Sequence, residues 1–335
     1  MHLTGTTQAI LLTILIVFYN VYLRFAVQAF EVQPLVFTCI TQIGCAFMLS
    51  LYAGPGPLAK ETLRSGATWL YSFMLIGAYI TDLYVVTYVT GTEASFFSRL
   101  TIPFSMFLAY TVLKRKPSAV DYVGVGFVLA GVVLLTSLQP AELLGPILFV
   151  AGLSALLQTT HFFIAETHPE SVTAHEAGSL RDRARVVGFA TFVVSSVFML
   201  GVFCLSVIDG FFRLGLSQKV DALPAVADFA HPATIWAALI YGLLVLPFAR
   251  YQKWAASYNM KSENLMIFLA FIPLTTMGME WLAGKVTGYS FNADAFEGER
   301  GAMLLLVAVL MTLGAGVTAF ARIRVALRGL PPGKD

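Results

Sequence analysis

Ten apolar segments, each close to the roughly 20 residues that a bilayer core requires, limit what this chain can fold into. They lie at about residues 9–29, 34–53, 68–89, 93–113, 119–138, 144–165, 186–208, 233–254, 263–286 and 301–321. Hydrophobic residues make up 58% of the chain and charged residues only 12%, whereas a soluble domain usually carries about 25% charged residues. The sequence therefore predicts an all-α integral membrane protein with ten transmembrane helices.

The distribution of Lys and Arg predicts the orientation of these helices. If the N-terminus is cytoplasmic, most of the 21 basic residues lie in cytoplasmic segments, as the positive-inside rule requires. Arg250 and Lys253 close one span at its cytoplasmic end, and we interpret them as basic residues that anchor this helix end at the membrane surface. The basic residues in outer loops are then Arg213, Lys219, Lys285 and Arg300. We expect a multi-pass protein of the cytoplasmic (inner) membrane with both termini in the cytoplasm.

Two of the spans open with related sequences, at residues 88–103 and 258–273. The two copies align without a gap and share Tyr, Glu, Ile and Pro, with Thr in one copy where the other has Ser. In the predicted topology the first copy runs inwards and the second runs outwards. Inverted repeats of this kind are typical of secondary transporters that work by alternating access. We therefore expect two inverted five-helix repeats, at residues 1–138 and 139–335.

Three segments carry a resemblance to a known family: residues 92–103 (TEASFFSRLTIP), 113–118 (LKRKPS) and 122–135 (YVGVGFVLAGVVLL). They have a small residue near the start of a helix, a proline within it, a short charged turn and a Gly-rich helix. Residues 18–24 and 33–35 also resemble the end of that family's first helix and the start of its second. The chain resembles ten-helix members of the drug/metabolite transporter superfamily, of the EamA type.

The resemblance implies a secondary transporter of small organic metabolites such as amino acids, working as an exporter. The chain departs from the family pattern in its charged turn, where Lys114, Arg115 and Lys116 replace an acidic–basic pair. Its connections at residues 166–185 and 209–232 are also longer than usual. These departures concern the substrate rather than the fold.

Charged residues within the predicted spans give the strongest functional signal, because each costs roughly 2.5–3.5 kcal/mol at a helix centre. At 1.5 Å per residue, four of them lie at a similar depth, roughly 10 Å below the outer surface. These four are Arg24, Asp82, Arg99 and Glu280. Two are basic and two are acidic, so together they form either a binding site for a zwitterion or an outer gate of ion pairs.

Each of the four also has a simpler interpretation. Arg24 can extend its side chain to the membrane interface. Asp82 and Arg99 can form a static pair between neighbouring helices, and Glu280 can face a water-filled vestibule.

Three further residues complete the predicted substrate site. Tyr22 and Tyr84 lie deep enough in their spans to line a cavity wall. Under the inverted repeat, His161 falls near the position of Arg24, where it either relays protons or hydrogen-bonds a neighbour.

The repeated residues have structural interpretations as well as functional ones. Glu93 and Glu263 each follow Thr or Ser at the start of a helix, which is typical of capping. Pro103 and Pro273 lie within their spans, where a missing N–H predicts a kink that contributes to gating.

Small residues predict where helices pack closely. Gly124 and Gly126 lie in one apolar span, and Gly314 and Gly316 lie in another. Glycines of this spacing allow helix backbones to approach each other in membranes.

Several function classes find no support in the sequence. It has no Walker-type loop for ATP, no metal-ligand spacing, no Ser/His/Asp set and no basic patch for nucleic acid. We expect no enzymatic activity and no cofactor. The expected partners are a small-molecule substrate and membrane lipid, with proton coupling as one option. The alternatives are a flippase for a lipid or lipid-linked headgroup, and a non-transporting scaffold.

Overall fold

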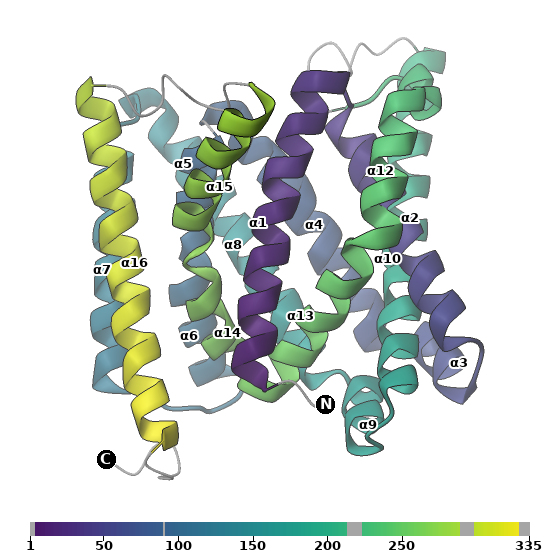
Figure 1. Ribbon diagram of the computed structural model, residues 1–335, viewed down its shortest axis with the longest axis horizontal. Coiled ribbons are helices and arrows are strands. Elements are labelled where there is room, and N and C mark those ends of the chain that lie inside the picture. Colours follow the sequence, from purple (N-terminus) through teal and green to yellow (C-terminus); the bar gives the residue numbers. More distant parts are fainter. Residues whose placement is uncertain (1–3, 90, 213–222, 289–297, 328–335) are drawn as a thin grey trace. The chain divides into compact units, whose positions relative to one another are not determined.

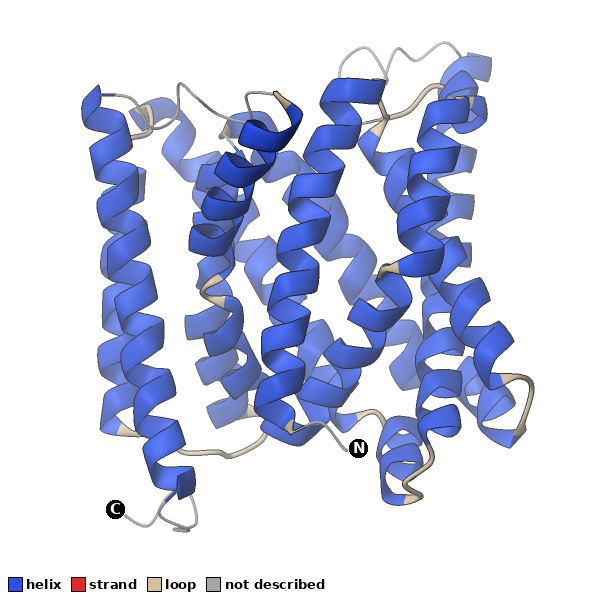
Figure 2. Ribbon diagram, viewed as in Figure 1, coloured by secondary structure: helices blue, strands red, loops and turns tan. Residues whose placement is uncertain are grey.

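The computed structural model describes residues 4–89, 91–212, 223–288 and 298–327. Every element within these residues is a helix, and none is a strand (Figure 2). The prediction of an all-helical protein is confirmed.

Seven helical segments of the described chain are long and apolar enough to cross a membrane. An eighth is added if α12 and α13, which meet at 44°, are a single span. The helices that make up these spans are α1 (Gly5–Phe30), α2 (Pro34–Ala53), α7 (Ala119–Thr136), α8 (Leu144–Thr167), α10 (Leu180–Phe212), α12 (Pro232–Leu244), α13 (Leu246–Met260), α14 (Ser262–Leu269), α15 (Ile272–Thr287) and α16 (Gly298–Leu327).

The two remaining predicted spans are also helical. The segment predicted at 68–89 forms α4 (Gly66–Tyr88). The one predicted at 93–113 is divided into α5 (Gly91–Phe97), the 3₁₀-helix η1 (Ser98–Leu100) and α6 (Thr101–Thr111). Seven or eight spans are therefore shown by length and composition, and ten spans in an inverted repeat stay a prediction. The short helices are α3 (Pro57–Arg64), η2 (Ala141–Leu143), α9 (Pro169–Glu176) and η3 (Val226–Ala230).

The chain divides into two compact units, each built from separate parts of the sequence. Unit 1 comprises Met1–Val17, Gly77–Thr160 and Asn259–Asp335, and unit 2 comprises Phe18–Ile76 and His161–Tyr258. These units describe compactness, whereas the predicted division at residues 138 and 139 describes a sequence duplication, which stays a prediction.

In unit 1, α7 and α16 lie side by side and approach closely through two glycines (Figure 1). A Cβ added to Gly314 would lie 2.6 Å from the carbonyl oxygen of Gly124. Gly126 and Gly316, in contrast, have no atom within 4 Å of an added Cβ. The packing predicted from small residues is therefore made by one glycine of each pair.

The hydrophobic core of unit 1 lies beside this contact. It includes Phe96 and Phe97 of α5, Leu135 of α7 and Val307 of α16, which are nearly or completely buried. Large apolar side chains from three helices thus meet in one cluster, which stabilises the unit through van der Waals packing.

In unit 2, α2 packs against both α10 and α12 (Figure 1). Small residues again set the closest approaches. A Cβ on Gly242 would lie 2.7 Å from the carbonyl oxygen of Thr41, and one on Gly188 would lie 2.9 Å from the Cβ of Leu49. These positions require glycine because the partner atoms belong to backbone or to a Cβ.

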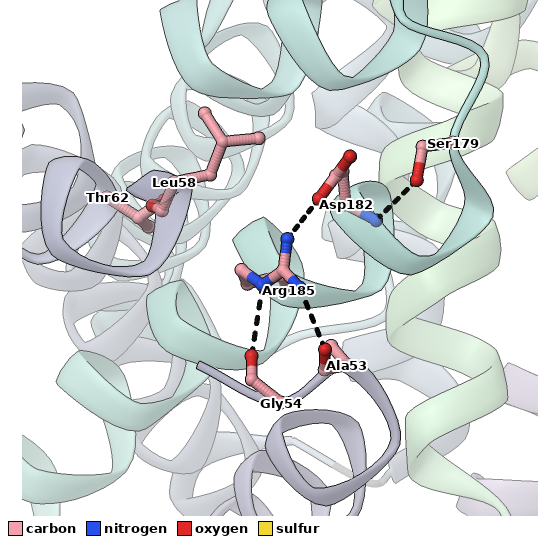
Figure 3. Close-up of polar contacts among 7 residues, drawn as sticks. All are labelled: Ala53, Gly54, Leu58, Thr62, Ser179, Asp182 and Arg185. Carbon is pink, nitrogen blue, oxygen red and sulfur yellow. Dashed lines mark hydrogen bonds and ion pairs between the residues drawn. The ribbon is translucent and has the colours of Figure 1, made fainter. Parts of the chain in front are cut away.

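Arg185 of α10 closes the C-terminal end of α2 (Figure 3). Its guanidinium donates to the carbonyls of Gly54 at 3.0 Å and Ala53 at 2.9 Å, and it pairs with Asp182. The backbone N–H of Asp182 is held in turn by Ser179 Oγ at 3.1 Å. The last carbonyls of a helix have no partner within the helix, so this arginine satisfies groups that α2 leaves open.

Candidate functional site

Two membrane segments of unit 1 are broken helices, and a proline follows each break. Pro103 is the third residue of α6, after η1, and Pro273 is the second residue of α15, after α14 ends at Leu269. The sequence placed both prolines inside continuous helices, whereas the structure places each in the first turn of a new helix. Proline is well tolerated there because the first N–H groups of a helix have no partner within it. Their role in gating stays a prediction.

Arg99 lies in the first of these breaks and contacts the second. Its side chain is buried, and its guanidinium donates to Ser95 O at 3.2 Å and to Ser98 Oγ at 2.7 Å. It also donates to the carbonyl of Leu269, the last residue of α14. Arg99 therefore links the interrupted backbones of two membrane segments.

Asp82 of α4 is held by two side chains of α8. Gln158 Nε2 donates to both carboxylate oxygens at 2.8 Å, and the hydroxyl of Ser154 donates to one of them. Arg99 interacts with Asp82 electrostatically, but the hydrogen-bond partners of the carboxylate are Ser154 and Gln158. The sequence interpretation missed this pair, although their spacing of four residues places them on one face of a helix.

The other predicted site residues are divided between the two units. In unit 1, Glu280 is buried in α15, and Tyr84 of α4 is exposed. In unit 2, Arg24 of α1 is half-buried, and Tyr22 donates to the carbonyl of Ala237 at 3.0 Å. The predicted convergence of Arg24 with Asp82, Arg99 and Glu280 thus involves both units and stays a prediction.

The repeated glutamates both lie in first turns and both bind arginine. Glu93 of α5 accepts from Arg300 at 2.6 Å and from Gln139 at 3.0 Å. Glu263 of α14 accepts from Arg115 at 2.8 Å. Their position at helix starts agrees with the capping interpretation, but Ser262 is the first residue of α14 rather than its N-cap. The ion pairs were not expected from the sequence.

His161 of α8 belongs to a buried cationic cluster in unit 2. Its Nε2 accepts a hydrogen bond from the ammonium of Lys253 on α13. The ammonium also lies over the ring of Phe162, 4.3 Å from its centroid, and 5.8 Å from the centroid of Tyr71. His161 was predicted to contribute to the substrate site, and the structure places it beside a lysine.

Arg250 lies one helical turn before Lys253 and completes this cluster. Its guanidinium donates to Gln42 Oε1 at 2.8 Å and to the hydroxyl of Tyr71 at 3.5 Å. Trp254 Nε1 donates to the same hydroxyl at 3.3 Å. The interpretation of Arg250 and Lys253 as anchors at the membrane surface was wrong, because both are buried, with exposed fractions of 4% and 7%.

Comparison with known proteins finds a matching family model. The model of the EamA-like transporter family matches residues 3–137. Over these residues, which are less than half of the chain, the sequence is similar to that family. This family is part of the drug/metabolite transporter superfamily, so the predicted resemblance is confirmed.

The remaining comparisons concern the fold alone. One crystal structure, described only as that of a protein, superposes on this chain with a TM-score of 0.56 and 16% sequence identity. The match covers 91% of this chain and 96% of the other. No functionally curated protein matches the sequence. The EamA-like match and the apolar helices indicate a multi-pass membrane protein that transports small molecules.

The described residues contain no group of side chains suited to bind a metal ion. No three His, Cys, Asp or Glu residues are grouped there to hold a metal ion. Two other groups of polar side chains are present. Asp82 is hydrogen-bonded to Ser154 and Gln158, and Lys253 is hydrogen-bonded to His161.

Proposed function

We propose that this protein is a secondary transporter that exports small organic metabolites, such as amino acids, by alternating access. The observation that carries the proposal is the position of Arg99, which lies in one broken membrane segment and donates to the broken end of another. Substrate sites of secondary transporters are typically formed by such discontinuous helices, whose open backbone groups coordinate polar ligands.

The charges around this break support a polar substrate. Asp82 and Arg99 interact electrostatically without sharing a hydrogen bond, so a substrate that carries both an amine and a carboxylate has a complementary group for each. Ionisable side chains within membrane segments mark substrate or ion pathways. We also assign proton coupling to Asp82. Its hydrogen-bond donors, Ser154 and Gln158, are neutral, so the carboxylate can accept a proton without breaking an ion pair.

A counterflow assay tests the proposal. The purified protein is reconstituted into liposomes that contain a mixture of unlabelled amino acids, and uptake of each labelled amino acid is followed. We expect uptake of at least one compound, and we expect Asp82→Asn to abolish it while the protein still elutes as a single species. Ser105→Ala, which removes a hydroxyl that only bonds its own helix at Ile102 O, is the matched control. Absence of exchange for metabolites of every charge would reject the transporter.

The predicted topology belongs to the same proposal. Both termini and residue 179 are placed in the cytoplasm, and residue 217, which lies outside the described residues, is placed outside. Labelling of Ser217→Cys, but not Ser179→Cys, by an impermeant reagent on intact cells is the expected result. Labelling of Ser179→Cys, but not Ser217→Cys, would reject this topology.

A further inference from the structure

The surroundings of Asp82 carry an inference about proton coupling, which rests on the proposed function. Asp82 lies on α4, and its hydrogen-bond donors, Ser154 and Gln158, lie on α8. All three residues belong to unit 1. Ser154 is buried, whereas Asp82 and Gln158 are half-buried. Neutral side chains therefore hold the carboxylate in place without covering it completely.

The amide of Gln158 binds both oxygens of the carboxylate. Its Nε2 donates to Asp82 Oδ1 and Oδ2, each at 2.8 Å, and to Ser154 Oγ at 3.2 Å. The hydroxyl of Ser154 in turn donates to Asp82 Oδ1. All of these bonds present donors to Asp82, which suits an ionised carboxylate, because this form only accepts hydrogen bonds.

Protonation of Asp82 reverses the requirement at one of its oxygens. A protonated carboxyl group carries an O–H donor, and this donor needs an acceptor. A glutamine amide contains a carbonyl oxygen as well as its N–H groups, so rotation of the amide replaces Nε2 by Oε1. A serine hydroxyl also donates and accepts. The two neighbours on α8 can therefore satisfy Asp82 in either state, whereas a lysine or an arginine offers donors only.

The charged group that acts on Asp82 is Arg99, through an electrostatic interaction. The hydrogen bonds of its guanidinium go to Ser95 O, Ser98 Oγ and the carbonyl of Leu269. Arg99 thus keeps its own partners whether Asp82 is ionised or protonated. The hydrogen-bonding groups that can change with the proton lie on α8.

We propose that Gln158 is the positioning residue for proton coupling at Asp82. Its amide donates to the ionised carboxylate and turns to accept a hydrogen bond from the protonated one. The proton comes from water and binds one carboxylate oxygen, so the only covalent bond that forms is the O–H of Asp82. Because the hydrogen bonds are satisfied before and after this step, α4 and α8 can stay packed in both states.

Infrared difference spectroscopy of the purified protein in detergent tests this assignment without a substrate. During a pH titration, the band of a protonated carboxylic acid that is lost in Asp82→Asn belongs to this side chain. In protein labelled with ¹³C at the side-chain carbonyl of glutamine, we expect an amide band to change over the same pH range. This change should be absent from Asp82→Asn, because its side chain does not titrate.

Two variants of Gln158 should move the pH profile of the Asp82 band in opposite directions. Gln158→Leu removes the donors to the ionised form, so the acid should form at a pH higher by about one unit or more. Gln158→Lys offers only donors and adds a positive charge, so the acid should form at lower pH. Thr160→Val is the matched control on α8, because the Thr160 hydroxyl donates to the carbonyl of Leu156. It should leave the profile unchanged.

Three outcomes would overturn the inference: Asp82 does not titrate while the protein is folded, its profile is the same in Gln158→Leu, or no glutamine amide band changes with it. The last of these needs only the unmodified protein and Asp82→Asn, so it decides the matter if the Gln158 variants do not fold. Exchange in the counterflow assay would then leave the transporter proposal standing. The expected titrations without exchange of any compound would instead support the proton site and reject the transporter.

Discussion

The guanidinium of Arg99 donates a hydrogen bond to the carbonyl oxygen of Leu269. In a continuous α-helix this carbonyl would accept from the N–H of residue 273, four positions later. Residue 273 is proline and has no N–H. Arg99 therefore supplies a donor to a backbone group that the proline leaves without its helical partner.

This relationship predicts that Arg99 and Pro273 are energetically coupled. Arg99→Gln should lower the free energy of unfolding by about 1–3 kcal/mol, because a buried carbonyl loses a charged donor. In a Pro273→Ala background the loss should be smaller by about 1 kcal/mol, since the alanine N–H can serve the Leu269 carbonyl. Thermal unfolding of the two single variants and the double variant measures this coupling. Pro247→Ala on α13 of unit 2 is the control, and equal losses in both backgrounds would refute the coupling.

The glycines between α7 and α16 predict a contrast within one helix. Gly124→Ala should destabilise the protein by about 1–3 kcal/mol, because the new Cβ would lie 2.7 Å from the carbonyl oxygen of Gly314. Gly126→Ala places its Cβ in open space, and alanine favours a helix by up to about 1 kcal/mol over glycine. Melting temperatures of the two variants should therefore move in opposite directions. A similar decrease in both would show that the α7–α16 contact is not close.

The two ion pairs of the repeated glutamates should differ in strength because the carboxylates differ in burial. Glu93 is 1% exposed, and its partner Arg300 is a surface residue, whereas Glu263 is 12% exposed. Arg300→Gln should cost about 1–3 kcal/mol by removing a charged donor from a buried carboxylate. Arg115→Gln should cost less, about 1 kcal/mol, because Glu263 keeps some contact with solvent that can replace the lost donor. Chemical unfolding in detergent would show whether this order holds, and the reverse order would contradict it.

Two histidines at α9 predict that stability falls in mild acid. Burial lowers the pKa of His168 to about 4 against the opposing effect of Glu170. Burial also lowers the pKa of His175 to about 4, with the carbonyl of Ser171 opposing and the charge of Arg183 adding to the effect. His168 contacts Thr68 at 2.9 Å, and His175 stacks on Tyr258.

The sign follows from proton binding. The pKa of an unfolded histidine is about 6.5, so between about pH 6.5 and pH 4 the unfolded chain binds protons that the folded protein does not. Stability contributed by the neutral histidines is therefore complete above about pH 6.5 and decreases as pH falls through this window. The melting temperature of the unmodified protein should decrease between pH 7.5 and pH 5. The double variant His168→Gln, His175→Gln should show a shallower decrease, and an identical pH profile would reject the assignment.

The sequence by itself determined the helical class, the approximate positions of the membrane segments and the resemblance to the EamA-like family. These follow from the length and apolarity of each segment, as with α2 and α7, and from local patterns such as the residues that follow Thr92. It also selected His161 and Arg99, because a polar side chain in an apolar segment is conspicuous without any knowledge of its neighbours.

Only the tertiary structure decided which side chains meet. From the sequence, Lys253 and Arg250 resembled anchors at the membrane surface, because basic residues near a helix end look the same whether they are exposed or buried. Their burial results from the packing of α2, α4 and α8 around them. Likewise, Ser154 and Gln158 donate hydrogen bonds to Asp82 only because α8 packs against α4. Helix formation depends on neighbours within a few residues, whereas the partners of a buried charge come from distant segments, so the sequence specified the helices and the fold specified the site.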